Sequence, residues 1–295
     1  PRELNWPHYP SIIFTSNNFD TDDVFKIWLV NSINKGATYF VGQHGNNYGT
    51  SKYLANNTVE EETANGFISW GWFKKSNNLI KGFYFKQSSY KKRSIKKIST
   101  RTKVLIITLP MLYQYNTWDD CFEYQEYLKK LSILLTKISN LPTKKNFLVR
   151  LHHAKLHKVF DESAYLQDKF KKLSFDDGTL NINNLYKKHS LVVHTYDSTG
   201  IFETLVKNIP TLILIYDGFE SHNNFGRNIY QILKDADILF FTSEKIFTKI
   251  SKVESNCHGW WNSRKIQDAR IKFLDSYAIE SKSPVRDLHR AFNSK

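Results

Sequence analysis

Short apolar, β-prone runs alternate along this chain with stretches of helical periodicity, and this alternation constrains the fold most strongly. The runs lie at 11–15, 38–41, 103–110, 147–151, 191–194, 211–215 and 238–241. Strands that are joined through helices by short connections are typical of a parallel sheet. The sequence therefore predicts an α/β fold.

Helices are predicted between these runs, at 22–34, 118–139, 200–208 and 226–235. The first follows Thr21-Asp22-Asp23, whose side chains can accept hydrogen bonds from the free N–H groups of a first helical turn. Four of its residues are expected to face the core: Val24, Ile27, Trp28 and Ile33. A last amphipathic helix is predicted from Trp260 to Tyr277.

A basic segment separates the two halves of the chain. From Thr63 to Trp118 there is no acidic residue, whereas eleven residues are basic. We place a domain boundary at 98–101, inside this polar stretch. The expected organisation is a Rossmann-like domain at 1–99, a second one at 100–265, and a helix at 266–295 that packs across both. Because the chain begins without Met, the first domain is expected to be part of a longer one.

The chain is strongly basic, with a net charge of +14 over 295 residues. Such a charge attracts phosphates, anionic lipid surfaces or nucleic acid. The basic residues of 74–103 are interleaved with aromatic ones, which can bind single-stranded nucleic acid. No pattern of a known nucleic-acid-binding motif accompanies them, so nucleic acid is not the expected partner. An anionic membrane surface, a phosphorylated glycan acceptor or a plain solvated surface explains this charge equally well.

The cysteine content and the hydropathy bear on the cellular compartment of the protein. The chain has two Cys, without metal-ligand spacing, so we expect neither a disulfide framework nor a zinc site. No apolar run approaches the roughly 20 residues that span a bilayer, and no signal peptide is recognised. A reducing, cytoplasmic setting is expected, with peripheral attachment to the inner face of the membrane as an option.

One candidate binding loop follows the run at 191–194. It contains Thr195, Ser198 and Thr199, with Glu203 about one helical turn later. The junction of a strand with the next helix faces the crevice of an α/β sheet, where ligands bind. Hydroxyls and N–H groups at a helix N-terminus favour phosphate, and a carboxylate one turn on can accept hydrogen bonds from ribose hydroxyls. The alternative is an ordinary N-cap followed by a solvated glutamate.

A second candidate loop, Gln43-His44-Gly45, follows the run at 38–41. Its glycine allows a ligand to approach the backbone, and its histidine can serve as a general base or a phosphate partner. Glu60 and Glu61 come soon after and can supply a carboxylate to the same cleft. The alternatives are a structural turn for the loop and a solvated helix face for the two acids.

A third candidate, Arg150-Leu151-His152-His153, ends the run at 147–151. An arginine there is suited to a bidentate grip on a diphosphate, and His152 lies at the same edge. No acidic or Cys ligand stands near these histidines at helical spacing, so no metal site is predicted.

Several motifs together make the chain resemble a family of bacterial surface-carbohydrate transferases over nearly its whole length. The matching pieces are Phe14-Thr15-Ser16-Asn17-Asn18-Phe19, Gly42-Gln43-His44-Gly45, Ser69-Trp70-Gly71-Trp72, Ser198-Thr199 with Glu203, Asn208-Ile209-Pro210 and Trp260-Trp261-Asn262. The family looks like a group of GT-B glycosyltransferases, distantly related to enzymes that use CMP-linked Kdo or sialic-acid-type sugars.

This resemblance implies two facing Rossmann-like domains, an acceptor side at 1–99 and a nucleotide-sugar site at 100–265. It implies no metal and no separate cofactor, because the nucleotide sugar is the substrate. Ser198, Thr199 and Glu203 would then contact the nucleotide, Arg150 the phosphate, and His44 the reacting centre. The expected partners are a nucleotide-sugar donor and a glycan or glycolipid acceptor of lipopolysaccharide or capsule synthesis.

A looser resemblance points to CDP-glycerol glycerophosphotransferases. It rests on the order of the loop with His44, the strand end with Arg150 and the turn Tyr196-Asp197-Ser198-Thr199. In that family the histidine activates the acceptor hydroxyl. Gln43 and Glu203 depart from its pattern. A non-catalytic module that binds glycan or nucleic acid is the third hypothesis.

Overall fold

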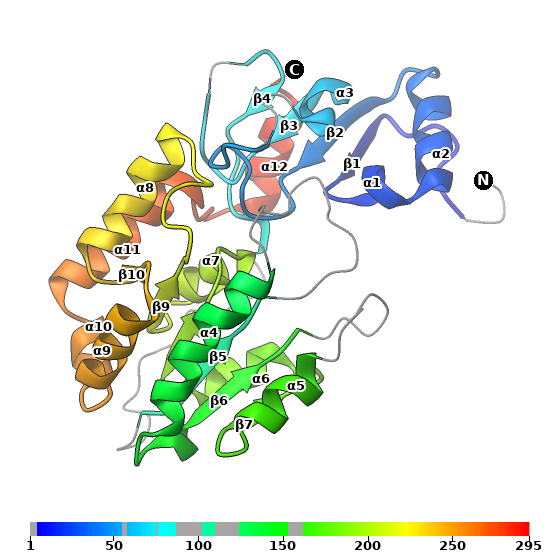
Figure 1. Cartoon of the computed structure of the whole chain (residues 1–295). Coiled ribbons are helices and arrows are strands. Elements are labelled where there is room, and N and C mark those ends of the chain that lie inside the picture. Colours follow the sequence, from blue (N-terminus) through cyan, green and yellow to red (C-terminus); the bar gives the residue numbers. More distant parts are fainter. Residues whose placement is uncertain are drawn as a thin grey trace. The chain divides into compact units, whose positions relative to one another are not determined.

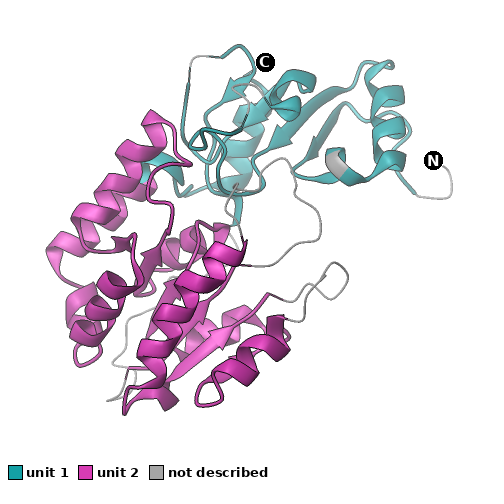
Figure 2. Ribbon diagram, viewed as in Figure 1, with its two compact units in different colours: residues 1–89, 275–295 teal, residues 90–274 magenta. Residues whose placement is uncertain are grey.

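The computed structural model describes residues 5–54, 58–74, 76–86, 102–109, 124–152 and 162–294, apart from the side chain of Asp20. The chain divides into two compact units, coloured separately in Figure 2. Unit 1 comprises Pro1–Ser89 with Asp275–Lys295, and unit 2 comprises Tyr90–Leu274. Each unit is described by itself.

Unit 1 is built on a four-stranded parallel sheet (Figure 1). Its strands, in spatial order, are β1 (Ile12–Thr15), β2 (Thr38–Gly42), β3 (Gly66–Ile68) and β4 (Leu79–Ile80). The predicted strands at 11–15 and 38–41 are confirmed, and they pair in parallel with Ile13 opposite Tyr39. The carboxyl end of β2 leads directly into the loop of His44.

The helices of unit 1 are α1 (Asn18–Thr21), α2 (Asp23–Ile33), α3 (Val59–Thr63) and α12 (Pro284–Phe292). The predicted cap is confirmed, since the Asp22 carboxylate accepts a hydrogen bond of 2.9 Å from the N–H of Phe25. Phe292 of α12 packs against Phe40 of β2, with ring centroids 4.9 Å apart. The last helix of the chain therefore completes the core of the first unit.

The predicted core face of α2 is wrong. Val24 and Ile27 are 56% and 66% exposed, whereas Phe25 and Leu29 are buried. This helix carries apolar residues on two sides, one series spaced by three and the other by four. The series spaced by four contacts the core, and the pattern alone does not decide between them.

Unit 2 is built on a six-stranded parallel sheet in the spatial order β10-β9-β8-β5-β6-β7. The strands are β5 (Val104–Ile107), β6 (Phe147–Arg150), β7 (Ser174–Asp176), β8 (Leu191–His194), β9 (Thr211–Leu214) and β10 (Leu239–Phe240). Strand β5, which comes first in the sequence of this unit, lies between β6 and β8. The order therefore reverses between β5 and β8, which is the switch point where doubly wound sheets bind ligands.

Helices cover both faces of this sheet, as alternation along β5 shows. Val104 and Ile106 join a core cluster with residues of α4, α5 and α9, whereas Leu105 packs on the other face with Leu185 of α6. The helices of unit 2 are α4 (Tyr124–Ser139), α5 (Glu162–Lys169), α6 (Ile182–Lys188), α7 (Thr199–Val206), α8 (Asn224–Asp235), α9 (Ser243–Val253), α10 (Cys257–Trp261) and α11 (Arg264–Tyr277), whose last residues belong to unit 1; a 3-10 turn, η3, covers Lys144–Asn146. The predicted helices at 200–208 and 226–235 are confirmed as α7 and α8.

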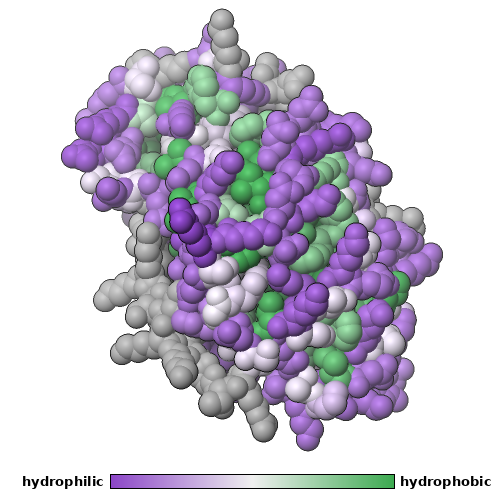
Figure 3. All heavy atoms as spheres, turned by 90° about the vertical axis from the view of Figure 1, so that its left-hand side faces the viewer, coloured by the Kyte–Doolittle hydropathy of each residue, from purple (hydrophilic) through white to green (hydrophobic). Residues whose placement is uncertain are grey.

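The helix predicted from Trp260 to Tyr277 is confirmed from Arg264 onward, as α11, but it does not continue back to Trp260, because the helix is interrupted between α10 and α11. The Ser263 hydroxyl donates 2.8 Å to the carbonyl of Trp260, and the Gln267 amide donates 2.8 Å to that of Trp261. These side chains occupy the carbonyls that a continuing helix would use. The outward face around α8, α9 and α11 is mostly hydrophilic with small apolar spots (Figure 3). Within the described residues no helix is long and apolar enough to cross a membrane.

The predicted domain boundary at 98–101 lies outside the described residues. The segment 266–295 is shared, since Asp275–Lys295 belongs to unit 1 and the residues before it to unit 2. Packing of this segment across both domains stays a prediction.

Candidate functional site

Thr195 follows β8 at the switch point and is completely buried. Its hydroxyl donates 2.9 Å to the carbonyl of Ile107 at the end of β5, and it lies 2.6 Å from the hydroxyl of Tyr127. The Tyr127 hydroxyl also accepts 2.8 Å from the N–H of Leu109. Thr195 thus links β5 and β8 to α4. Its hydroxyl, which we predicted to bind the donor, is engaged in these contacts.

Ser198 and Thr199 form the start of α7 beside these contacts. Ser198 occupies the N-cap position with extended backbone, and Thr199 is the first helical residue. The Ser198 hydroxyl is not used to cap the helix; it lies 3.4 Å from Nδ1 of His194. The predicted strand-to-helix junction is therefore present, with both hydroxyl residues at the carboxyl edge of the sheet.

Glu203 lies one turn into α7 and is half-buried. Its charge acts on Tyr196, whose pKa is raised to about 12 by burial, with Glu203 and Asp197 adding to the shift. Tyr196 is therefore a neutral phenol at physiological pH. The α7 entrance combines an oriented helix terminus with a carboxylate and a phenol, groups that suit phosphate and hydroxyls respectively.

A buried network of polar contacts lies beside this turn, and the sequence did not predict it. The Asp197 carboxylate accepts 2.7 Å from the hydroxyl of Tyr230, and it lies 3.3 Å from Nε2 of His222. Both side chains are at most 3% exposed. His222 follows β9 just as Asp197 follows β8, so position after neighbouring strands is the signal that could have found the pair.

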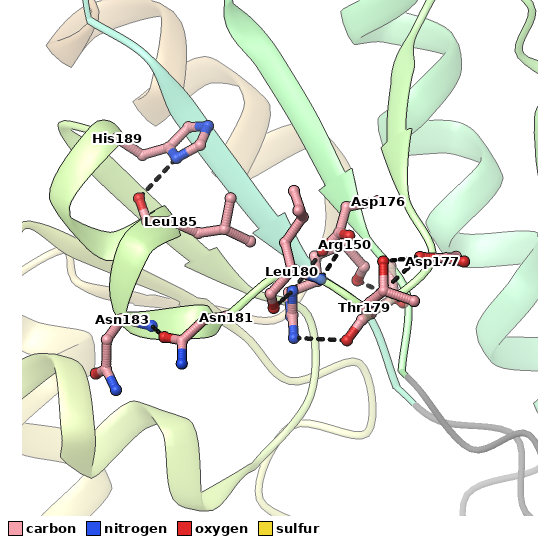
Figure 4. A network of polar contacts seen from close by, with 11 residues as sticks. Arg150, Asp176, Asp177, Thr179, Leu180, Asn181, Asn183, Leu185 and His189 are labelled. Atoms are coloured by element: carbon pink, nitrogen blue, oxygen red, sulfur yellow. Dashed lines mark hydrogen bonds and ion pairs between the residues drawn. The ribbon is translucent and has the colours of Figure 1, made fainter.

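Arg150 lies at the carboxyl end of β6, as predicted, but its guanidinium is engaged by the protein (Figure 4). It forms an ion pair with Asp176 of β7 and donates to the carbonyls of Gly178 and Leu180 at 3.1 and 2.8 Å. The same turn is stiffened by Thr179, which hydrogen-bonds the Asp177 carboxylate. These contacts indicate that Arg150 holds the ends of β6 and β7 together. A role for Arg150 in binding the donor phosphate stays a prediction.

The remaining histidines of this edge are His152, His153 and His157. His152 is exposed, and His153 and His157 lie outside the described residues. No group of three His, Cys, Asp or Glu side chains that could hold a metal occurs in the part of the chain that the structure describes. Metal independence stays a prediction.

In unit 1, Gln43 is the centre of a buried hydrogen-bond cluster. Its side-chain oxygen accepts from the N–H of Trp70 at 2.9 Å and from the indole of Trp72 at 2.7 Å. Its amide nitrogen donates to the carbonyl of Gly45 at 2.8 Å and to the hydroxyl of Tyr277 at 3.2 Å. With 1% exposure, Gln43 shapes the loop from within; the predicted contact of Gln43 and Gly45 with a ligand stays a prediction.

His44 is half-buried, and its ring stands edge-on to Tyr48, with ring centroids 6.4 Å apart. The Tyr48 hydroxyl donates 2.7 Å to the carboxylate of Glu60. A backbone φ of +73° at Gly49 closes the loop, and a Cβ there would meet the Trp72 ring at 2.6 Å. His44 is therefore presented by a rigid, tightly packed loop.

Glu60 and Glu61 are each 4% exposed, so the alternative of a solvated face is wrong for both. Glu61 forms an ion pair of 2.9 Å with Lys74. Burial raises the pKa of the Glu61 carboxyl, and Lys74 partly offsets this shift. Both acids lie on the short α3 next to the loop of His44, where Tyr48 and Lys74 hold them. A catalytic role for either stays a prediction.

Comparison with known proteins identifies the class of this fold. S. aureus MnaA, solved with UDP, is 9% identical, with a TM-score of 0.52 over 96% of this chain and 75% of that chain. The pneumococcal O-GlcNAc transferase GtfA, solved with UDP and GlcNAc, is 10% identical, with a TM-score of 0.50 over 99% and 57%. The spinosyn rhamnosyltransferase SpnG is 12% identical, with a TM-score of 0.43 over 95% and 73%. A search of curated proteins found no match.

Two parallel α/β sheets, the second with a doubly wound strand order, and the likeness to MnaA and GtfA define a protein of the GT-B fold class, as predicted. A model of the LIC12162 family transferases matches residues 2–292. The chain belongs to this family of transferases, and the prediction of an enzyme that transfers a group is confirmed.

Proposed function

We propose that this chain is a glycosyltransferase that moves a sugar from a CMP-linked donor to a bacterial surface-glycan acceptor, with no metal or other cofactor. One observation carries the proposal: the N-terminus of α7, with Ser198 and Thr199, lies at the switch point of unit 2, and Glu203 follows one turn later. This is the position at which doubly wound sheets bind nucleotides.

The geometry of unit 2 suits a departing nucleotide. The first turn of α7 directs N–H groups and the positive end of the helix dipole toward a phosphate. Negative charge that develops on the leaving nucleotide would be stabilised there. The Glu203 carboxylate can accept hydrogen bonds from ribose hydroxyls, and such bonds would orient the donor.

In unit 1, His44 is the group best suited to take a proton from the acceptor hydroxyl. It is half-buried on a rigid loop, and an imidazole is the side chain that most often serves as a general base. Glu60 and Glu61 already have partners in Tyr48 and Lys74. We therefore place His44 ahead of them in this role.

The cytidine base rests on the resemblance to CMP-dependent enzymes. S. aureus MnaA and pneumococcal GtfA, which share the fold, were solved with UDP. The test is consequently a screen of CMP-, CDP-, UDP- and TDP-linked donors with the full chain, in which mass spectrometry follows donor consumption. Release of CMP from a CMP-linked sugar is the expected result. Consumption of CDP-glycerol would favour glycerophosphate transfer instead, and consumption of no donor would reject the proposal.

His44→Ala tests the base in the same assay. General-base catalysis contributes roughly 100- to 10,000-fold to rate, so donor turnover should drop by at least about 100-fold while CMP binding is retained. His8→Ala, at an exposed position, is the matched control. Equal turnover of the two variants would remove His44 from the mechanism.

We also propose that the enzyme works in the cytoplasm, at the inner face of the membrane, where a glycolipid acceptor is available. Support comes from the net charge of +14 and the basic segment 74–103, of which Lys74, Lys81, Lys86 and Lys103 lie within the described residues. Sedimentation with vesicles tests this: binding to anionic but not neutral vesicles, lost at high salt, is expected.

A further inference from the structure

The hydroxyl of Thr204, buried inside α7, fixes the first step of the inference. It donates to the carbonyl oxygens of Gly200 and Ile201, at 3.2 and 3.0 Å. It also lies 3.2 Å from Nε2 of His194. A hydroxyl has a single proton, and the carbonyls use it. Thr204 must therefore accept in its contact with His194, so Nε2 of His194 carries a proton.

His194 is neutral, and this fixes its other nitrogen. The side chain is completely buried, and burial lowers its pKa to about 3. A neutral imidazole has one N–H, so Nδ1 is an acceptor. Gly200 lets the backbone of α7 approach this ring closely, since a Cβ there would come within 2.9 Å of its Cε1.

Ser198 completes the chain of hydrogen bonds. Its hydroxyl lies 3.4 Å from the acceptor Nδ1 of His194, so the serine proton points inward. The Tyr196 side chain also hydrogen-bonds Ser198. Because Ser198 has given its only proton to His194, Tyr196 is the donor in this second contact.

We propose that Tyr196, Ser198, His194 and Thr204 form a hydrogen-bond chain with one fixed direction, from the α7 entrance into the core, so that Ser198 meets a ligand only as an acceptor. His194 and Thr204 are then positioning residues, since they contact no ligand and act through Ser198. The inference rests on the proposed function for the nature of the ligand, but the direction of the chain rests on the hydrogen-bond geometry and on the burial of His194.

This orientation decides which part of a nucleotide sugar Ser198 faces. Phosphate oxygens carry no proton at neutral pH and need donors, which Ser198 does not offer. Hydroxyl and amino groups are donors, and they match the lone pairs of Ser198 and Tyr196. The structure thereby assigns ribose or sugar hydroxyls to this side of the entrance, and phosphate to the backbone N–H groups of α7.

The direct test is the tautomer of His194, read from imidazole ¹H–¹⁵N correlations of the full-length ¹⁵N-labelled protein, with His194→Gln to assign the signal. We expect a proton on Nε2, none on Nδ1, and no titration between pH 5.5 and 8.5. A proton on Nδ1, or a titration near pH 6.5, would overturn the proposal. This experiment needs no nucleotide, so it decides the matter even if CMP, CDP and UDP all fail to bind and the proposed function falls.

A binding experiment separates positioning from plain stability. Thr204→Val removes the acceptor for His194, and Thr211→Val removes a hydroxyl that is equally buried and equally bonded to a backbone carbonyl, on β9. One lost hydrogen bond corresponds to roughly a 2- to 10-fold change in affinity. We expect CMP binding to weaken by this factor in Thr204→Val, to be unchanged in Thr211→Val, and to recover in Thr204→Ser. Equal affinities in the two valine variants, or no recovery in the serine variant, would overturn the positioning role.

Discussion

The hydroxyl of Tyr127 lies 2.6 Å from that of Thr195, and this contact joins α4 to the end of β8 where the strand order of unit 2 reverses. Both side chains are buried, and the N–H of Leu109 shares the same tyrosine oxygen. The loops that leave β5 and β8 are thereby held together. The nucleotide site that we propose rests on this fixed edge.

Tyr127→Phe should destabilise unit 2. The half-buried N–H of Leu109 loses its acceptor and the buried hydroxyl of Thr195 loses its partner, which together cost about 1–3 kcal/mol and lower the melting temperature by several degrees in calorimetry. Tyr165→Phe is the control, because the Tyr165 side chain is exposed and its hydroxyl accepts a hydrogen bond from the exposed Lys169. Equal shifts in melting temperature for the two variants would show that the contacts of the Tyr127 hydroxyl do not stabilise unit 2.

Arg150→Met and Asp176→Asn should lower the melting temperature by similar amounts, since either change leaves one buried partner of the ion pair uncompensated. CMP affinity should stay within roughly 3-fold of wild type in both variants, because Arg150 is engaged by the protein and not by the nucleotide. A loss of one hydrogen bond to the charged phosphate would weaken binding by more than this factor. A loss beyond 10-fold in Arg150→Met alone would restore the phosphate-binding role that its sequence position predicts.

Gln43→Leu should disrupt the loop of His44. The substitution leaves the N–H of Trp70 and the indole of Trp72 without their buried acceptor, at about 1–3 kcal/mol for each group. The change should also be visible in tryptophan fluorescence. Gln231→Leu, on the exposed side of α8, is the matched control. Wild-type fluorescence and stability in Gln43→Leu would contradict the structural role.

Stability should fall in acid because of His194. The unfolded histidine takes up a proton near its ordinary pKa of 6.5, whereas the folded one does so only near pH 3. Between these values the unfolded state binds more protons, so the contribution is complete above pH 6.5 and declines as the pH falls, by up to about 1.4 kcal/mol per pH unit. Melting temperatures between pH 7 and 4.5 should drop faster for wild type than for His194→Gln. Parallel curves would contradict a buried neutral His194.

Much of the fold was predictable because its central strands are short apolar runs. Strands β5, β8 and β9 lie where the pattern predicts, and α7 follows β8 as expected. Strand β7 was not predicted: it is three residues long, ends in Asp176, and lies in a polar stretch. The face of α2 and the break before α11 depend on tertiary contacts that local periodicity does not contain.

The candidate site was predictable in position but not in hydrogen bonding. Chain order placed Thr195, Ser198 and Arg150 at the carboxyl edge of the sheet. Only the structure shows that Thr195 and Arg150 are occupied by other parts of the protein. Gln43 illustrates the reason. Its hydrogen-bond partner Tyr277 is 234 residues away in the sequence, and local sequence patterns do not predict contacts between residues so far apart.

The most direct measurement of the central claim is the affinity of CMP for wild type, Glu203→Gln and Glu244→Gln, by calorimetry at fixed salt. Glu203 lies one turn into α7, whereas Glu244 is an exposed residue of α9. We predict that wild type and Glu244→Gln bind equally and that Glu203→Gln binds about 10-fold more weakly, a difference of about 1.4 kcal/mol. Equal binding by all three proteins, or by none, would contradict a nucleotide site at the start of α7.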